Sequence, residues 1–274
     1  MLSDDKYLKK IVDLSFKPVF IIGSHRSGTT LLYEILSQNK SFEYVNAYHV
    51  IKYDQILANH IAGIEEKAIK ELSEEFIQSG INDRVFDSIK VTPELPEEYG
   101  FILKNKGFEN FLNESSLDLF REMCRKIHFI HNRQYILLKN PWCFPHFMFI
   151  KTAFPDAKFI FIHRNPIHVI NSKLKAVRKT LSEWSPYTAL VSLRYQSIFK
   201  NPLKRAFFSF VYSPYLNRGV IRTTNQAIEA TQYYLENISE LRESDYFETT
   251  YENLCSNPNE EIQSANSSMK CNRF

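Results

Sequence analysis

The chain has 274 residues, of which 44% are hydrophobic and 24% charged, and its formal net charge is +3. This composition is that of a globular protein and excludes a disordered chain, and so small a net charge does not by itself indicate nucleic acid or an anionic membrane as a partner. The four cysteines form no C-x-x-C pair, which argues against a zinc ribbon or a disulfide framework and favours a reducing compartment.

The N-terminus and the longest apolar runs carry no targeting or membrane-spanning signal. The first sixteen residues are too charged to hold the apolar region of a signal peptide. The longest apolar runs, at residues 18–23 and 158–163, have the length of a strand and are too short to span a membrane. We therefore expect a soluble, cytoplasmic protein.

Apolar runs of strand length alternate with helical patterns along the chain. This alternation predicts an α/β fold in which helices cover both faces of a parallel sheet. No domain boundary is evident, so we expect one domain over residues 1–274, with a core over about 17–258 and a polar tail over 259–274. The predicted strands span residues 18–23, 135–138, 158–162 and 246–250, and the predicted helices span residues 29–36, 65–80, 115–132, 166–179 and 224–242.

The first candidate site is the loop between the first predicted strand and helix, Gly23-Ser24-His25-Arg26-Ser27-Gly28-Thr29-Thr30. Glycines at its ends let consecutive backbone N–H groups point at an anion, and the helix N-terminus adds partial positive charge. The spacing fits the G-x-x-x-x-G of a P-loop, but Thr29 stands where a nucleoside triphosphatase has its lysine. Arg26 supplies a cation inside the loop, which favours a phosphate with a transferable group over a magnesium triphosphate. The plainer alternative is an ordinary glycine-containing turn.

The second candidate site follows the predicted strand at 158–162. Arg164 stands at the carboxyl end of this strand, the edge where open α/β sheets place ligands. Pro166 begins a helix, and Ser172 lies about two turns along it. An arginine fork and a serine hydroxyl can together hold a phosphate. A surface arginine and a helix-facing serine are the structural alternative.

Together, the two motifs resemble those of the sulfotransferases that use 3′-phosphoadenosine-5′-phosphosulfate (PAPS). Residues 26–30 match the R/K-S-G-T-T loop that holds the 5′-phosphosulfate end of the donor in that family. Arg164 and Ser172 match the pair that holds its 3′-phosphate, at the preserved interval. Further family-like elements follow in order up to about residue 258: L-L-K-N-P at 137–141, F-P-D-A-K at 154–158, and Y-E-N-L with a later N-P at 251–258.

The resemblance implies a three-layer α/β fold, a central parallel sheet flanked by helices, related to that of P-loop nucleoside triphosphatases. It implies transfer of a sulfuryl group from PAPS to an acceptor hydroxyl without a metal. Residues 26–30 would hold the sulfuryl end of the donor, and Lys139 is similar to the family lysine that steadies the transferring group. Without the resemblance, Lys139 is as easily a solvated lysine that ends a strand.

The residue that removes the acceptor proton is not fixed by the sequence. Cytosolic family members carry a histidine two residues after the lysine, where this chain has Pro141, and tyrosylprotein-type members use a glutamate at the position of Ala47. His49 is the first candidate for the general base, because a histidine can accept a proton at neutral pH. The alternatives are Glu43, Glu98 and His146, and any of these side chains could instead be structural.

The acceptor and the C-terminal region are less defined. Residues 184–222, where similar enzymes place an acceptor-binding lid, mix aromatic and basic side chains. Such a lid suits a lipid-like alcohol or contact with a membrane surface, and core aromatics between solvated cations are the alternative. No glycine follows Gly219, whereas family members close over the donor with a glycine-containing basic loop, so we expect this clamp to be shortened. The acceptor could be a carbohydrate, a lipid, a peptide tyrosine or a small molecule, and no nucleic acid is expected.

Two other functions remain open. A catalytically degenerate protein of the same fold would bind the nucleotide and transfer nothing. A P-loop kinase for a small molecule would need ATP and magnesium, and the missing lysine argues against it.

Overall fold

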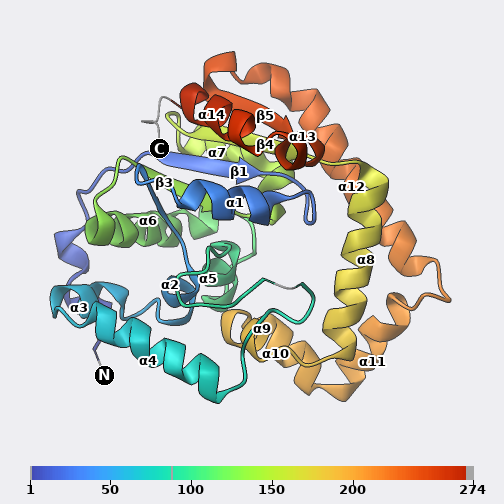
Figure 1. Cartoon of the computed structure of the whole chain (residues 1–274), viewed down its shortest axis with the longest axis horizontal. Coiled ribbons are helices and arrows are strands. Elements are labelled where there is room, and N and C mark those ends of the chain that lie inside the picture. Colours follow the sequence, from blue (N-terminus) through green and yellow to red (C-terminus); the bar gives the residue numbers. More distant parts are fainter. Residues whose placement is uncertain (1, 88, 270–274) are drawn as a thin grey trace.

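Five parallel strands form the centre of the computed structural model, which describes residues 2–87 and 89–269 (Figure 1). Their order in the sheet is β2-β3-β1-β4-β5. The four predicted strands are confirmed, and β2 is an additional short strand at the edge. The strands are β1 (Pro18–Ile22), β2 (Phe42–Tyr44), β3 (Tyr135–Lys139), β4 (Lys158–His163) and β5 (Tyr246–Thr250).

The strands at the centre of the sheet are buried on both faces, which explains their nearly continuous apolar sequence. All five residues of β1 are buried, and Phe20 pairs with Leu138 of β3 on one side and with Phe159 of β4 on the other. Successive side chains of each strand point to opposite faces. Two apolar cores therefore form, one on each side of the sheet.

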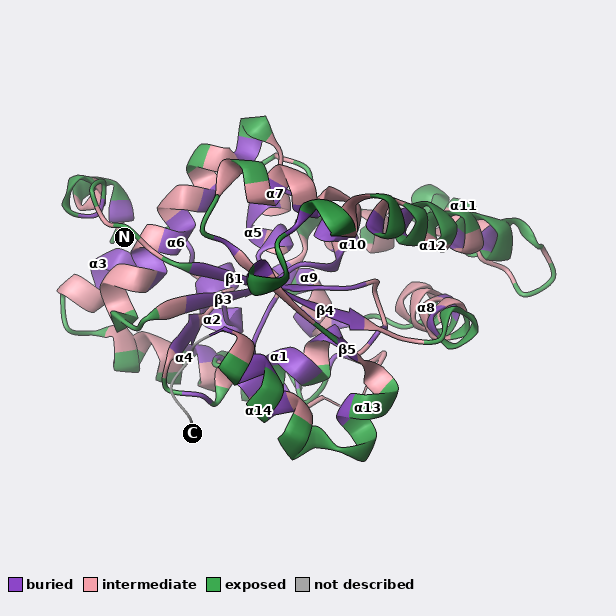
Figure 2. Cartoon of the chain, turned by 90° about the horizontal axis from the view of Figure 1, so that it is seen from above, coloured by how far each residue is buried: buried purple, intermediate pink, exposed green. Residues whose placement is uncertain are grey.

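The smaller core lies under one helix from the start of the chain and two consecutive helices near its end. Val19 and Ile21 of β1 pack there with Leu36 of α1 (Thr29–Ser37), Leu254 of α13 (Tyr251–Ser256) and Ile262 of α14 (Pro258–Ser268). Figure 2 shows these three helices on the same side of the sheet.

Helix α14 occupies the segment in which the sequence analysis places a polar tail. Ile262, Ala265 and Met269 are spaced so that they share one face of this helix, and all three are buried. Asn39 donates to the side chain of Asn266 at 3.2 Å, which ties the helix to the turn before β2. The segment up to residue 269 is therefore packed structure, while residues 270–274 lie outside the described part of the chain.

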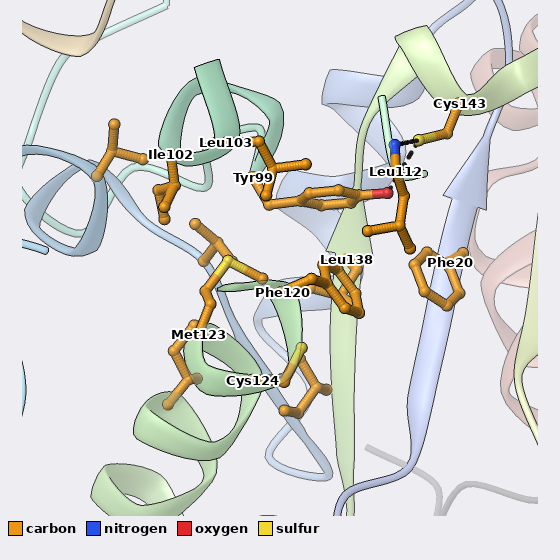
Figure 3. Close-up of a cluster of buried hydrophobic side chains, with 14 of the residues drawn as sticks. Phe20, Tyr99, Ile102, Leu103, Leu112, Phe120, Met123, Cys124, Leu138 and Cys143 are labelled. Carbon is orange, nitrogen blue, oxygen red and sulfur yellow. Dashed lines mark hydrogen bonds between the residues drawn. The ribbon is translucent and has the colours of Figure 1, made fainter. Parts of the chain in front are cut away.

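The larger core fills the other face of the sheet. Figure 3 shows part of it, where Phe20 and Leu138 of the sheet meet Phe120 and Tyr99. The Tyr99 hydroxyl lies 3.1 Å from Cys143 Sγ, so the aromatic core has a satisfied polar group at its centre. The helices on this side are α2 (Ala47–Ile51), α3 (Ile56–Ile61), α4 (Glu65–Gln78), α5 (Gly100–Asn105), α6 (Leu117–His131) and α7 (Phe147–Ala153), with short 3-10 helices at Asp4–Lys6, Leu8–Lys10, Glu114–Ser116 and Pro141–His146.

Helices from the later half of the chain form a wing beside the sheet (Figure 2). Three of them begin with a capping residue followed by proline, a favourable N-terminus: Asn165-Pro166, Ser185-Pro186 and Asn201-Pro202. Among the described helices, none is long and apolar enough to cross a membrane. The wing consists of α8 (Pro166–Ser182), α9 (Pro186–Val191), α10 (Leu193–Lys200), α11 (Pro202–Val211) and α12 (Arg218–Asn237), and 3-10 helices at Ile238–Glu240 and Glu243–Asp245 lead to β5.

Candidate active site

A cavity of about 850 Å³ lies between the carboxyl edge of the sheet and the wing. Its wall includes residues that follow four of the strands: His25 after β1, Trp142 after β3, Arg164 after β4 and Tyr251 after β5. Open α/β sheets bind ligands at this edge, where the carboxyl ends of neighbouring strands converge. Both candidate motifs of the sequence therefore contribute to a single cavity.

The conformation of the loop after β1 depends on its glycines, and Arg26 between them also has a positive φ of 74°. Gly28 has a φ of 101°, and a Cβ there would lie 2.5 Å from Cδ2 of Tyr251. At Gly23 a Cβ would lie 2.5 Å from the carbonyl oxygen of Ile162 in β4. The Ser27 N–H donates to the Ser24 carbonyl at 3.0 Å and closes the turn. The loop is thus wedged between β4 and α13 and opens into the start of α1.

Arg26, Arg164 and Ser172 are joined by direct hydrogen bonds. Arg26 Nε donates to Ser172 Oγ at 3.1 Å, and Arg164 Nη1 donates to the Arg26 carbonyl at 3.0 Å. The Arg164 guanidinium also lies over the Tyr251 ring, 4.1 Å from its centre. Hydrogen bonds therefore join the two candidate motifs, which lie as far as 146 positions apart in the sequence, and Arg26 and Arg164 make this part of the cavity wall cationic.

Two buried donors, one on Arg164 in the cavity wall and one on Ser27 in the loop after β1, have spare hydrogen-bonding capacity. Within the described part of the chain, Arg164 Nε and Ser27 Oγ are buried and have no hydrogen-bond partner. Leaving a buried polar group unpaired costs about 1–3 kcal/mol, so such donors are most easily explained by a ligand that accepts from them. A phosphate or sulfate group has the acceptor oxygens and the negative charge that this wall lacks.

Lys139, the last residue of β3, does not reach the cavity wall itself. Its side chain is fully buried, and its ammonium donates to Glu98 Oε1 at 2.9 Å and to Thr30 Oγ1 at 3.3 Å. Glu98 and Thr30 both line the cavity. Lys139 therefore acts on the cavity through these two neighbours.

Glu98 is an ionised carboxylate in the cavity wall. Burial alone would raise the pKa of Glu98, but the Lys139 ammonium, with smaller contributions from His25 and Arg84, holds that pKa below its usual value. The next residue, Tyr99, is anchored in the core through its contact with Cys143 (Figure 3). The backbone that carries Glu98 is thus fixed, and its carboxylate is available as a proton acceptor at neutral pH.

The other three candidates for the general base lie away from the cavity wall. His49 is 1% exposed, and its Nδ1 accepts the Asn46 N–H in the cap of α2. Burial, with a small contribution from His131, lowers the pKa of His49 to about 3. Glu43 is buried against His128 at 2.8 Å, and the ring of His146 stacks on Phe111 at 4.2 Å. Of the four candidates, Glu98 alone belongs to the cavity lining.

Three lining residues were not singled out by the sequence analysis. Burial lowers the pKa of His25 to about 4, so this imidazole is neutral at pH 7, and it packs edge-on against Trp142. Burial and then the nearby Arg222 lower the pKa of Lys173, which bonds Gln226 at 2.9 Å. Tyr251 supports Arg164. His25 and Tyr251 lie within motifs that the sequence shows, the loop at 23–30 and the Y-E-N-L element, whereas no motif marks Lys173.

A buried ion pair borders the cationic wall. Arg84 Nη2 donates to Asp87 Oδ2 at 2.7 Å, and the same oxygen lies 3.4 Å from Arg26 Nη1. Arg84 also lies 3.8 Å from Glu97, whose carboxylate accepts the Tyr187 hydroxyl at 2.6 Å. Asp87 therefore partly neutralises Arg26.

The far end of the cavity, within the wing, is mainly apolar. Its walls come from the inner faces of α8, α10, α11 and α12. An apolar end opposite a cationic end is the arrangement of a site that binds an amphipathic ligand or two different ligands. The lining side chains there include Val169, Val177, Leu181, Ile198, Phe208 and Ala230.

Solved structures similar to this one are sulfotransferases. A sulfotransferase from Mycobacterium avium aligns with a TM-score of 0.61 and 13% identity over 98% of this chain and 67% of its own. One from Mycobacterium tuberculosis aligns with a TM-score of 0.57 and 13% identity over 98% and 72%. The sulfotransferase domain of the curacin biosynthetic pathway aligns with a TM-score of 0.50 and 15% identity over 95% and 76%. These alignments show a shared fold.

A search of curated proteins gives no match to this sequence. The family model described as the sulfotransferase family matches residues 18–207, which include the loop after β1, Lys139 and the Arg164–Ser172 pair. This match covers more than half of the chain. The chain therefore belongs to the sulfotransferase family, with a three-layer α/β fold built on a parallel five-stranded sheet.

Proposed function

We propose that this protein transfers a sulfuryl group from PAPS to the hydroxyl group of an acceptor. The observation that supports it most is that Arg26 and Arg164 line the same cavity, and that hydrogen bonds join Arg26 to Ser172 and Arg164 to the Arg26 carbonyl. A donor with phosphate groups at both the 3′ and 5′ positions needs two anion sites within one cavity, and these residues provide both.

The chain has the residues that such a donor requires. Bound PAPS would supply an activated sulfuryl group. Arg26 and the N-terminal turn of α1 would hold its 5′-phosphosulfate end, and Arg164 with Ser172 would hold the 3′-phosphate. The unpaired Arg164 Nε and Ser27 Oγ would then gain acceptors. Lys173 adds a further cation to the same side of the cavity.

The reaction is a displacement at sulfur. A bond forms between sulfur and the acceptor oxygen, the bond between sulfur and the bridging phosphate oxygen breaks, and adenosine 3′,5′-bisphosphate leaves with the extra negative charge. Fixed cations that face this developing charge lower the barrier, because they need no reorganisation during the reaction. Arg26 is placed to do this directly, and Lys139 is placed to do it through Thr30.

The acceptor proton must go to a base in the cavity, and we assign this role to Glu98 in preference to His49. Glu98 lines the cavity and is held ionised by Lys139 at 2.9 Å. His49 is sealed in the core, where its ring caps α2. A base must come within hydrogen-bond reach of the proton that it removes, and Glu98 is placed for this.

The experiment that tests the donor is a thermal-shift titration with adenosine 3′,5′-bisphosphate and, separately, with ATP and Mg²⁺. At 100 times its dissociation constant, a ligand stabilises the folded protein by about 2.7 kcal/mol. We expect this stabilisation with the bisphosphate and its loss in Arg26→Ala. Stabilisation by ATP and Mg²⁺ alone would refute the proposal and favour a kinase.

A second measurement separates an active enzyme from one that only binds. The purified protein is incubated with PAPS and a panel of sugars, lipid alcohols and phenols, and the release of adenosine 3′,5′-bisphosphate is followed. Release that depends on an acceptor supports transfer. Tight bisphosphate binding without release for any acceptor class would assign the chain to the catalytically degenerate group.

A further inference from the structure

Positive charge is concentrated in the wing and its approach. Of the 34 Lys+Arg and 31 Asp+Glu in the chain, twelve basic residues but a single acidic residue, Glu183, lie within residues 157–228. The net charge of +3 is therefore the sum of a basic region, residues 157–228, and the rest of the chain, in which acidic residues outnumber basic ones. Some of these cations face the donor site, but most of those on α10 to α12 are exposed at the surface.

Helix α11 carries an apolar stripe on its outer surface. Leu203, Phe207 and Phe210 are 83%, 61% and 56% exposed, and their spacing puts them on one face of the helix. We call these three residues the α11 stripe. Tyr215, in the turn that follows, is 93% exposed. Singly exposed apolar side chains are normal, but consecutive turns of large exposed ones indicate an interaction surface.

The opposite face of α11 is fixed to the protein. Arg205 donates to the carbonyl groups of Leu181 and Ser182 at 2.8 and 3.0 Å, and Arg178 donates to the Tyr212 carbonyl at 2.7 Å. Phe208 and Tyr212 line the cavity. The stripe is therefore the outward face of an anchored helix, at the projecting end of the wing (Figure 2).

Basic side chains border the stripe. Lys204 is adjacent to Leu203 and one turn from Phe207. Lys200 ends α10, two residues before α11, and Arg218 begins α12, and all three are exposed. No acidic residue occurs between 184 and 228. An apolar helix face with cations beside it and no acid nearby is the composition of a helix that lies in the interface of an anionic bilayer.

We propose that the α11 stripe docks on the surface of an anionic lipid bilayer. Its apolar side chains enter the boundary between headgroups and acyl chains, and Lys200, Lys204 and Arg218 pair with lipid phosphates. A second copy of this chain fits the surface less well, because a twofold contact places each basic face against the same basic face. The proposal does not depend on the donor, since no residue of the stripe lines the cavity.

The test is flotation of the full chain with phosphatidylcholine vesicles that either lack or contain 30% phosphatidylserine. We expect the chain to float with the anionic vesicles and to be released at 0.5 M salt, which screens charges over a few ångströms. Lys200→Glu with Lys204→Glu should weaken partitioning by at least about fivefold for each cation lost. Leu203→Asn with Phe207→Ser should weaken it by about tenfold or more.

Matched controls lie on the other side of the molecule. Ile77 on α4 and Val12 are 74% and 52% exposed, so Ile77→Asn with Val12→Ser removes comparable apolar surface. Lys67→Glu with Lys70→Glu on α4 reverses the same number of charges. Both control variants should float as the wild type does, and all variants should keep its unfolding temperature and its bisphosphate binding.

Three results would overturn the proposal. The first is a failure of the wild type to float with anionic vesicles. The second is an equal loss in the stripe variants and in the controls, which would indicate a general effect of charge or hydrophobicity. The third is a dimer in sedimentation that Leu203→Asn with Phe207→Ser converts to monomer, which would assign the stripe to a second copy. None of these results bears on bisphosphate binding, so the donor proposal is judged separately.

Discussion

The packing between Gly28 and Tyr251 allows a direct test of the conformation of the loop after β1, residues 23–30, which we propose holds the donor. Gly28→Ala adds one methyl group where φ is 101° and where the ring of Tyr251 would lie 2.5 Å away. The left-handed backbone costs a non-glycine residue about 1–2 kcal/mol. Overpacking in a tight site adds about 1–3 kcal/mol. We therefore expect Gly28→Ala to lower the free energy of unfolding by about 2–5 kcal/mol.

Gly107 provides the matched control. Its φ is 93°, and a Cβ there would meet no atom within 4 Å. Gly107→Ala thus carries the backbone cost without the clash, and it should lower the free energy of unfolding by about 1–2 kcal/mol. Chemical denaturation of both variants, monitored by circular dichroism, measures the difference.

The substitution Tyr251→Ala tests whether contact with the Tyr251 ring causes the difference in unfolding free energy between Gly28→Ala and Gly107→Ala. In this background the nearest atom to the methyl group at position 28 is Ile162 Cδ1 at 3.2 Å, the end of a flexible side chain, so Gly28→Ala should cost little more than Gly107→Ala. The coupling energy in the double-mutant cycle should be about 1–3 kcal/mol. Equal costs for Gly28→Ala in the two backgrounds would refute the reasoning, because they would show that loop and ring are not in contact.

Three further predictions concern single side chains. Arg164→Lys keeps the charge but loses the guanidinium group that bonds the Arg26 carbonyl and stacks on Tyr251. Calorimetry should then show bisphosphate affinity reduced by about 10²-fold. Near-normal affinity would contradict the proposed role of Arg164. Glu98→Gln should lower kcat by about 10²-fold or more with bisphosphate affinity nearly unchanged, whereas an unchanged kcat would remove Glu98 as the base. The pKa of His49 is about 3 in the folded protein and about 6.5 in the unfolded chain. Between pH 7.5 and pH 5 the unfolded chain therefore gains a proton that the folded protein does not, and the free energy of unfolding falls by about 2 kcal/mol. His49→Gln, which retains the cap of α2, should remove this part of the pH dependence in denaturation at the two pH values, and a parallel loss in both proteins would contradict it.

The sheet could be predicted because buried parallel strands leave a clear mark in the sequence. Runs such as 18–22 and 158–163 are apolar throughout, since both faces of these strands are covered. Strand β2 has three residues and a buried glutamate, so no periodicity marks it. The turn between β1 and α1 was predictable from its glycine spacing because backbone geometry allows few alternatives there.

The choice of Glu98 as the proposed base could not be made from the sequence, because proximity in the sequence says little about which side chains meet in a cavity. His49 and Glu98 were both plausible from residue type alone. The contacts of the two residues differ. Glu98 bonds Lys139, 41 positions away, and lines the cavity, whereas the His49 ring accepts the Asn46 N–H three residues away in the cap of α2. The hydrogen bond from Arg26 to Ser172 is likewise invisible without the fold.

The helices α9 and α11 of the wing have a start signal in the sequence, a proline at the first turn. Pro186 and Pro202 each stand at the start of a helix, and a proline at the first turn is the signal that predicted α8 from Pro166. Aromatic and basic side chains dominated the interpretation of residues 184–222 as a lid. In the structure these residues form α9, α10, α11 and the start of α12, whose inner faces line the cavity.

The Asp87 carboxylate lies beside Arg26, where we propose that the anionic donor binds, and its negative charge should oppose that binding. Asp87 Oδ2 lies 3.4 Å from Arg26 Nη1 but 2.7 Å from Arg84 Nη2, so its main partner is Arg84. Asp87→Asn keeps an oxygen for Arg84 and removes one negative charge beside the donor site. Bisphosphate affinity should therefore rise, by about threefold to tenfold at low salt, and the gain should shrink at 0.5 M salt. A loss of affinity would mean that Asp87 positions Arg26 for the donor rather than competing with it, and isothermal calorimetry at the two salt concentrations decides between these roles.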